Sequence, residues 1–169
     1  TVGGGLQSFE EVKKLFNFGA DKVYFSKLLY NNVELIKEVS YTYGKQALVL
    51  GVNLIKKNNN YFIYENMKEP LYYISKIVNE LKIGELKVTF VDREGTGSGL
   101  DLNYIKKIQD EINAEVIFEG GIGSLNHIKQ SLNSGVKNLA VGNILFFSDN
   151  NLIKIKQYLK NNNFKVRNW

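Results

Sequence analysis

Apolar and polar positions follow two periods along the chain, one typical of helices and one typical of buried strands. Between Phe9 and Phe18 the apolar side chains fall three and four residues apart, which predicts an amphipathic helix. From Gln46 to Asn53 nearly every residue is apolar, which is typical of a strand covered on both faces in a parallel sheet. Strand and helix patterns then take turns down the chain, and this order predicts the α/β class.

The same periods assign the remaining elements. After an opening strand at Thr1-Val2, strands are predicted over Lys22 to Ser26, Gln46 to Asn53, Leu86 to Val91, Glu115 to Phe118 and Asn138 to Val141. Helices are predicted over Phe9 to Phe18, Val33 to Tyr43, Pro70 to Lys82, Asn103 to Ile112, Leu125 to Asn133 and Asn151 to Asn161. The segment Lys56 to Tyr64 breaks this alternation, and its Asn58-Asn59-Asn60 turn predicts a small hairpin.

Two stretches of the chain repeat each other. Gly4-Gly5-Leu6-Gln7-Ser8-Phe9 returns 116 residues later as Gly120-Gly121-Ile122-Gly123-Ser124-Leu125, and each copy reads as strand end, glycine turn and serine-capped helix. Self-similarity at a fixed distance indicates a duplicated architecture, and strand-plus-helix units of about 30 residues fit four times into that distance. The prediction is a (β/α)8 TIM barrel, of which residues 1–169 form a single partial domain of about six units, because a complete barrel usually needs about 250 residues.

Composition narrows the class of protein without indicating a macromolecular partner. There is no cysteine, so neither a disulfide nor a thiolate metal site is available. No apolar run approaches the length of about 18 residues expected of a membrane span, and no leader is recognised, so a cytoplasmic location without membrane contact is expected. The net charge of +5 gathers in the C-terminal helix and tail, where lysines suit the helix dipole, so no nucleic acid partner is expected.

The candidate chemistry lies where the predicted strands end. In a parallel barrel these ends and the loops behind them form the active face. Glycines let backbone N–H groups approach an anion there, and the following helix start adds a favourable dipole. Two equivalent glycine turns therefore predict a ligand with a phosphate at each end. The residues assigned to phosphate binding are Gly4, Gly5, Ser26, Lys27, Gly95, Gly120, Gly121, Gly142 and Asn143.

A carboxylate pair follows the strand Leu86 to Val91. Asp92 and Glu94 flank Arg93 and are candidates for acid/base chemistry at the active face. The alternative is that Asp92 caps the loop and pairs with Arg93. His127, the single histidine, is expected on a helix surface and is given no role.

These motifs together resemble the cyclase subunits of imidazole glycerol-phosphate synthase, in the histidine-biosynthesis barrel family. The resemblance runs from the family's third strand to its eighth. The matching runs are Val2-Gly3-Gly4-Gly5, Gly19-Ala20-Asp21-Lys22-Val23, Asp92-Arg93-Glu94-Gly95-Thr96 with Ser98-Gly99, Gly120-Gly121-Ile122-Gly123-Ser124, and Lys156-Gln157-Tyr158-Leu159 through Val166-Arg167.

The resemblance implies an activity and a partner. It implies a lyase without metal or organic cofactor that forms a heterodimer with a glutaminase and takes ammonia from it. The ammonia would convert a bisphosphorylated ribulosyl aminoimidazole carboxamide nucleotide to imidazole glycerol phosphate in histidine biosynthesis.

The resemblance also implies a catalytic set of Thr89, Asp92, Glu94 and the position of Asn53. Thr89 matches the family, whereas Asn53 stands where the family has a catalytic Asp. An amide cannot accept a proton as a carboxylate does, so acid/base work at Asn53 is expected to fall on the order of 10²-fold or more. The family's Asn-Thr after its fourth strand is Ser26-Lys27 in this chain.

These departures leave two further hypotheses open. One is a paralogue that delivers ammonia to a different acceptor, as in the amidation of surface-polysaccharide sugars, with Asn53 and Lys27 suited to another substrate. The other is a catalytically impaired barrel that binds phosphate or acts as a scaffold for the glutaminase.

Overall fold

The structure, a computed structural model, describes residues 1–26, 33–81 and 83–167. Lys27, predicted to bind phosphate, lies outside the described residues. The strands are β1 (Val2–Gly3), β2 (Val23–Phe25), β3 (Leu48–Lys57), β4 (Asn60–Ile63), β5 (Glu85–Phe90), β6 (Glu115–Glu119) and β7 (Asn138–Leu139). The helices are α1 (Phe9–Asn17), α3 (Val33–Tyr43), α4 (Pro70–Leu81), α5 (Leu102–Glu111), α6 (Leu125–Asn133), α7 (Asn143–Phe146) and α8 (Leu152–Asn161), with a 3-10 helix, η1, at Lys45–Ala47.

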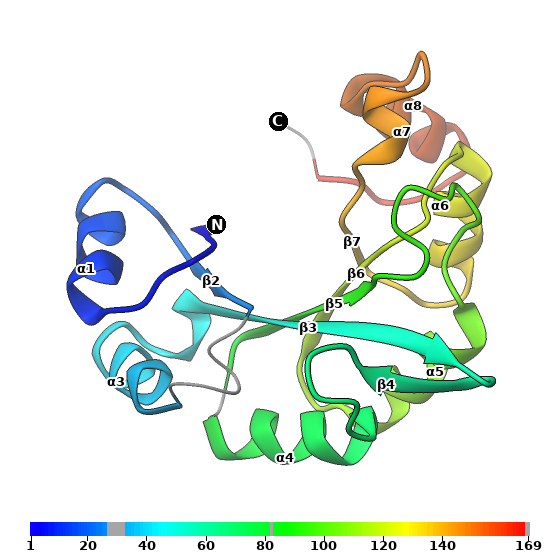
Figure 1. Cartoon of the computed structure of the whole chain (residues 1–169). Coiled ribbons are helices and arrows are strands. Elements are labelled where there is room, and N and C mark those ends of the chain that lie inside the picture. The colour runs from blue at the N-terminus through cyan, green and yellow to red at the C-terminus, as the bar shows by residue number, and fades with distance from the viewer. Residues whose placement is uncertain (27–32, 82, 168–169) are drawn as a thin grey trace.

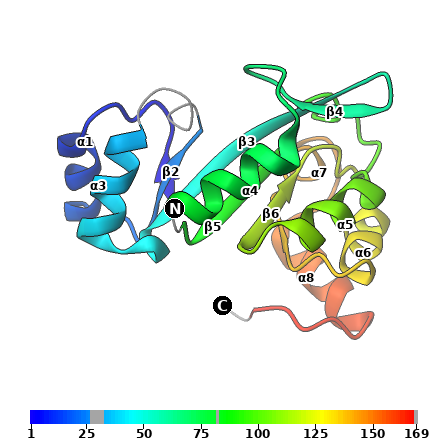
Figure 2. The same cartoon turned by 90° about the horizontal axis from the view of Figure 1, so that it is seen from below.

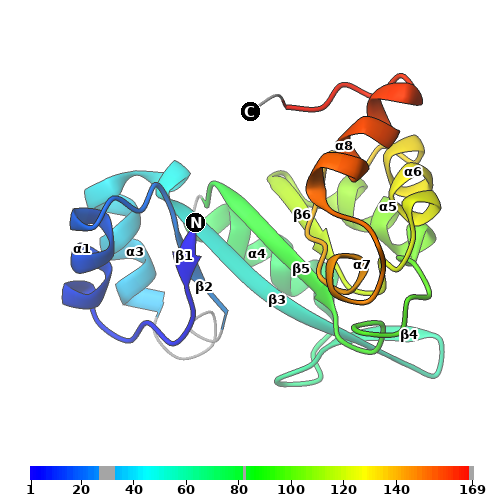
Figure 3. The same cartoon turned by 90° about the horizontal axis from the view of Figure 1, so that it is seen from above.

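The sheet confirms the predicted α/β barrel architecture in part of its circumference. Its strands follow the order β1-β2-β3-β5-β6-β7, and every pair along this path is parallel. Helices connect the strands and lie along the convex side of the curved sheet (Figure 1). In the part of the chain that the structure describes, β1 and β7 end the path and do not pair with one another (Figures 1 and 3).

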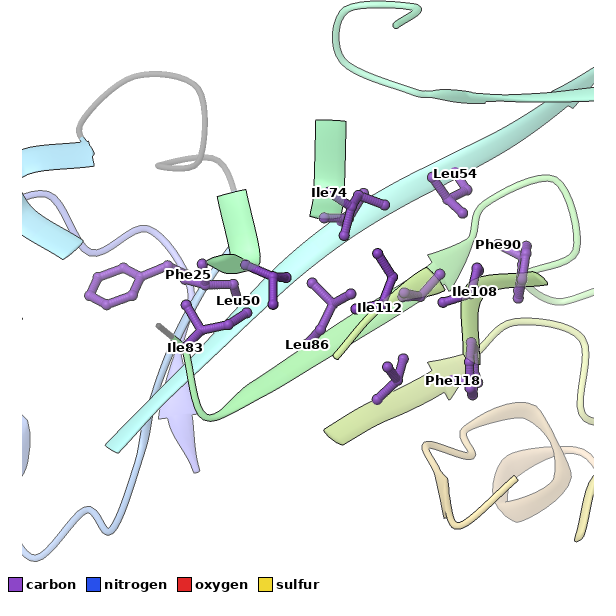
Figure 4. Close-up of a cluster of buried hydrophobic side chains, with 14 of the residues drawn as sticks. Phe25, Leu50, Leu54, Ile74, Ile83, Leu86, Phe90, Ile108, Ile112 and Phe118 are labelled. Atoms are coloured by element: carbon purple, nitrogen blue, oxygen red, sulfur yellow. The ribbon is translucent and has the colours of Figure 1, made fainter. Parts of the chain in front are cut away.

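The hydrophobic core lies between the sheet and the helices on its convex side. Leu50 of β3 is in register with Leu86 of β5, and both side chains are buried. Helix α4 runs along the outer side of these two strands (Figure 2) and contributes the buried Ile74. Ile108 of α5 joins the same apolar cluster (Figure 4). Alternate strand residues therefore face the helices, and the residues between them face the concave inner side.

The repeat recognised in the sequence extends to the backbone. Ser8 caps α1 with φ −139° and ψ 157°, and Ser124 caps α6 with φ −148° and ψ 159°. Val2 pairs with Val23, and the residues 116 positions later, Phe118 and Leu139, pair in the same way. The two strand–turn–helix–strand units are therefore structural copies.

In both copies a side chain accepts a backbone N–H just ahead of the helix, but the accepting residue differs. Glu11 Oε2 accepts the backbone N–H of Gln7 at 2.7 Å ahead of α1. In the second copy His127 Nδ1 accepts the N–H of Gly123 at 3.3 Å. His127 lies on α6 as expected, but its ring is only partly exposed and its hydrogen bond holds the chain at the start of the helix.

The strand predicted over Gln46 to Asn53 is shifted and extended. Its first residues form η1, and β3 continues to Lys57 because β4 pairs with it in an antiparallel hairpin. Asn58 and Asn59 make the turn with φ 50° and 64°, left-handed values that two-residue hairpin turns require and that Asn tolerates. The predicted hairpin is confirmed, but Asn53 lies within the strand, opposite Thr89, and not at its end.

Candidate functional site

The second glycine turn, Gly120-Gly121, forms a small pocket with the loop after β5 and with the start of α7. Its volume is about 90 Å³. The lining residues are Glu94, Gly95, Glu119, Gly120, Gly121, Ile122, Ala140, Gly142 and Asn143. The structure thus brings six of the predicted site residues together, from three separate strand ends.

Close backbone packing shapes this pocket. Gly121 has φ +87°, and a Cβ atom there would lie 2.5 Å from the carbonyl oxygen of Gly99. The N–H of Gly99 donates to the carbonyl oxygen of Gly121 at 2.7 Å. Asn143 Nδ2 donates to the carbonyl oxygen of Gly95 at 3.2 Å and ties α7 to the same loop. Only glycine fits at position 121, because both its backbone angle and its contacts exclude a side chain.

The first glycine turn, Gly4-Gly5, has a similar backbone in a different setting. Its φ values of 111° and 71° are close to the 113° and 87° of Gly120 and Gly121. Gly4 and Gly5 are exposed, whereas Gly120 and Gly121 are buried. Neither they nor Ser26 line the pocket at the second turn, and all three lie at the ends of β1 and β2. The predicted phosphate residues therefore form two separate groups.

A polar cluster on the inner face of the sheet joins β2, β5 and β6. Glu119 Oε2 accepts a hydrogen bond from Thr89 Oγ1 at 2.9 Å and forms an ion pair with Lys87 Nζ at 2.5 Å. Lys87 Nζ also lies 5.2 Å from the centroid of the Tyr24 ring. Thr89, predicted to be catalytic, is thus placed against a carboxylate to which the sequence prediction gave no role.

The pKa of Tyr24 is shifted by the charged residues of this inner face and by burial. Burial raises the pKa of its hydroxyl above the ordinary value, and the negative charges of Glu119 and Glu65 act in the same direction. The positive charge of Lys87 and a hydrogen bond with Ser26 lower the pKa, but they do not outweigh burial. Tyr24 is therefore a neutral hydroxyl group at physiological pH.

The alternation of apolar and polar residues along β5 is the sequence signal that identifies the inner face. In Leu86-Lys87-Val88-Thr89-Phe90 the apolar residues face the helices, and Lys87 and Thr89 face inward. Glu119 belongs to the same inward set because it pairs in register with Thr89. The prediction ended the strand at Phe118 and so placed Glu119 in the turn.

The other predicted catalytic residues are more exposed. Asn53 Nδ2 donates to Glu65 Oε1 at 2.7 Å, so the amide binds a carboxylate from the segment after β4. Glu94 is exposed at the rim of the small pocket, and Asp92 is exposed and does not line it. The alternative pairing of Asp92 with Arg93 is not seen, since Arg93 donates to the carbonyl oxygen of Gly99 at 2.8 Å and lies 4.0 Å from Asp101.

A larger pocket of about 600 Å³ lies between the hairpin and the start of α5. Asp101 is one of its lining residues and accepts hydrogen bonds from Lys56 Nζ at 2.9 Å and from the Tyr61 hydroxyl at 3.0 Å. Burial raises the pKa of the Asp101 carboxyl, but these bonds and the N–H of Tyr104 hold it below its ordinary value. This cluster anchors the hairpin to α5. None of the predicted site residues lines the larger pocket.

The described residues supply neither a metal site nor a membrane span. Across residues 1–26, 33–81 and 83–167, no three His, Cys, Asp or Glu side chains converge as metal ligands. None of the helices in these ranges has the length and apolar character needed to cross a bilayer.

Comparison with known proteins finds one family that matches most of the chain. The family described as histidine biosynthesis protein matches residues 1–151. The imidazole glycerol phosphate synthase subunit HisF of Chlorobium phaeovibrioides is 35% identical over 99% of this chain and 69% of its own length. The subunit of the same name from Exiguobacterium sibiricum is 30% identical over the same shares. A putative subunit hisF2 of Prochlorococcus marinus is 31% identical over 99% of this chain and 66% of its own length. On these matches, the chain belongs to the histidine biosynthesis protein family.

Proposed function

We propose that this chain is a cyclase subunit of the imidazole glycerol phosphate synthase type, acting in histidine biosynthesis. Similarity to subunits of that name over nearly the whole chain supports the proposal. The reaction would use ammonia, supplied by a glutaminase subunit, to convert a bisphosphorylated ribulosyl aminoimidazole carboxamide nucleotide to imidazole glycerol phosphate. No further cofactor takes part in the proposed reaction.

The matching backbone of the two glycine turns carries the proposal. Gly4 and Gly120 differ by 2° in φ (111° and 113°). Both turns follow the carboxyl end of a parallel strand and precede a serine-capped helix. Helix starts favour anions through their N–H groups and dipole. Two such turns support a ligand with a phosphate at each end, as the proposed nucleotide has.

A second candidate function is favoured by Asn53. Its amide donates to Glu65 on the inner face, and an amide side chain does not accept a proton as a carboxylate does. A paralogue that delivers ammonia to a different acceptor, such as a sugar of a surface polysaccharide, fits this exchange. The two candidates share the fold and the ammonia and differ in the acceptor.

Steady-state turnover tests the proposal. The chain, alone and with the glutaminase, is supplied with ammonium and the bisphosphorylated nucleotide, and imidazole glycerol phosphate is quantified. Formation of this product that depends on ammonium is expected. Amidation of a sugar acceptor in its place would establish the paralogue, and binding of the glutaminase without either product would establish a scaffold.

Two glycine variants test the phosphate sites with matched backbone strain. Gly5 (φ +71°) and Gly19 (φ +91°) both have open space where a Cβ atom would lie, but only Gly5 belongs to a glycine turn at the active edge. Gly5→Ala is expected to weaken nucleotide binding at least about tenfold, because losing one hydrogen bond to a charged group removes about 1.5–3 kcal/mol. Gly19→Ala is the control; equal loss in both variants would contradict a phosphate site at Gly5.

A further inference from the structure

The two copies of the repeat differ at the inward position just before the glycine turn. Gly3 of β1 pairs with Tyr24, and Glu119 of β6 occupies the equivalent position 116 residues later. A Cβ atom on Gly3 would lie 2.8 Å from the Cβ of Tyr24, so the first copy has no space for a side chain there. In the second copy the place of Tyr24 is taken by the small Ala140, which lines the same pocket as Glu119. A carboxylate is therefore present at only one of the two glycine turns.

Two donors on β5 orient this carboxylate. Lys87 Nζ and Thr89 Oγ1 lie 2.5 Å and 2.9 Å from the same oxygen of Glu119. Thr89 is buried, with 5% of its surface exposed, so its hydroxyl group is fixed by packing. Glu119 keeps 28% of its side chain exposed. The carboxylate is thus held in one orientation and remains open to the pocket beside Gly120 and Gly121.

Glu119 also lies where a carboxylate could accept a proton, which the amide of Asn53 cannot do. Asn53, Thr89 and Glu119 are in register across β3, β5 and β6. Neighbouring strands lie about 4.8 Å apart, so Glu119 is about 10 Å from Asn53 at the same level of the inner face. Asp92, Glu94 and Glu65 are more exposed than Glu119. Among these acidic side chains, Glu119 alone combines fixed partners with access to the pocket.

We propose that Glu119 is the catalytic carboxylate that transfers protons in the amination step. This inference rests on the proposed function. Ammonia forms a C–N bond to the carbonyl carbon of the acceptor, and the C=O π electrons move to oxygen. Glu119 accepts a proton from the nitrogen and returns it to that oxygen, which gives a carbinolamine. A second proton passes from the nitrogen through Glu119 to the hydroxyl group, and the oxygen leaves as water as the C=N bond forms. Lys87 and Thr89 are positioning residues that act through Glu119.

Kinetics of Glu119→Gln in the full chain test the assignment. The amide keeps the shape of the side chain but cannot accept the proton, so kcat with ammonium is expected to fall roughly 10²- to 10⁴-fold, with KM for the acceptor changed only a few-fold. Glu115→Gln is the matched control on the same strand, where the exposed carboxylate binds only Asn138 among the described residues. Its kcat is expected to stay unchanged.

A double variant guards against misfolding. Glu119→Gln leaves Lys87 without its ion-pair partner, and Glu119→Gln with Lys87→Met removes this unpaired charge. The double variant is expected to fold with an unchanged unfolding temperature and to show the same low kcat. A kcat within about threefold of the unaltered protein in either folded variant, far short of a typical proton-transfer effect, overturns the role of Glu119 and leaves the proposed function standing. An unaltered protein without turnover of either acceptor overturns both.

Discussion

Tyr24 and Gly51 depend on one another at the level of single atoms. The Tyr24 ring crosses the inner face of β3, and a Cβ atom on Gly51 would lie 2.7 Å from the ring carbon Cζ. Close-packed interiors do not admit such an overlap without movement of the ring or the strand. Glycine is therefore required at position 51 because the Tyr24 ring leaves no space for a side chain, and not because of the backbone angles.

Gly51→Ala is expected to destabilise the protein by about 1–3 kcal/mol, because it overpacks this contact. Tyr24→Ala should remove most of that penalty when the two changes are combined. Urea unfolding of the single and double variants measures the effect. Gly142→Ala is the control, since a Cβ atom there meets nothing within 4 Å; an equal loss at Gly142 would contradict the steric explanation.

Prediction from the sequence succeeded best for residues whose neighbours are close in the chain. The glycines and Asn143 around the small pocket were identified because strand ends share an edge. Glu119 was given no role because its partners Thr89 and Lys87 lie 30 and 32 residues away, on another strand. Contacts of this kind depend on register, which the local pattern of one strand does not specify.

At the scale of elements, Asp101 connects three parts of the fold. It binds Lys56 of β3 and Tyr61 of β4, and its Oδ1 accepts the backbone N–H of Tyr104 at the start of α5. The side chain is only 13% exposed. The hairpin is thereby fixed to the helix that follows the Asp92 loop.

Asp101→Asn is expected to lower the free energy of unfolding at pH 7 by about 1.5–3 kcal/mol, as for the loss of hydrogen bonds to a charged group. The pKa of Asp101 is lowered by folding, so its contribution is present above the ordinary aspartate value of about 3.9 and is lost as pH falls through the lower folded value. The variant should therefore lose less stability than the unaltered protein between pH 5 and pH 3, which are rough bounds of that range.

Urea unfolding at both pH values checks this expectation, with Asp110→Asn on the exposed side of α5 as the control. A difference between Asp101→Asn and the unaltered protein that persists undiminished at acid pH would contradict the role of the ionised carboxylate.

Element prediction failed where tertiary pairing overrode local pattern. The capped helices α1 and α6 were predicted within one residue, because Ser8 and Ser124 mark their starts chemically. Strand β3 was ended four residues early, since pairing with β5 reaches Leu54 and pairing with β4 extends the strand to Lys57. Helix α7 was not predicted, as its four residues are too few to show a period.

At the scale of the whole molecule, the path of parallel strands ends at β1 and at β7, and each of these pairs on one side only in the described part of the sheet. Edge strands present N–H and C=O groups to any strand that approaches. A polypeptide of these 169 residues is therefore expected to associate with itself as concentration rises, which sedimentation velocity measures. A single monomeric species with one sharp unfolding transition would contradict this.

Charge at the edge should reduce that association. Val2 of β1 is 47% exposed, and Val2→Lys places on the edge a residue that natural sheets use to prevent pairing. Tyr41→Lys adds the same charge on α3, where the side chain is 95% exposed. Only Val2→Lys is expected to shift the distribution of sedimenting species toward monomer.

The exchange of Gly3 for Glu119 between the two copies has a consequence for how a substrate would lie. A molecule that is alike at both ends can settle across a pseudosymmetric edge in either of two directions. With a proton-transferring group beside only one turn, one direction reacts and the reverse is a dead end that competes with it. The difference between Gly3 and Glu119 would thus make the two turns of a duplicated barrel unequal in chemistry and fix the direction in which a substrate reacts.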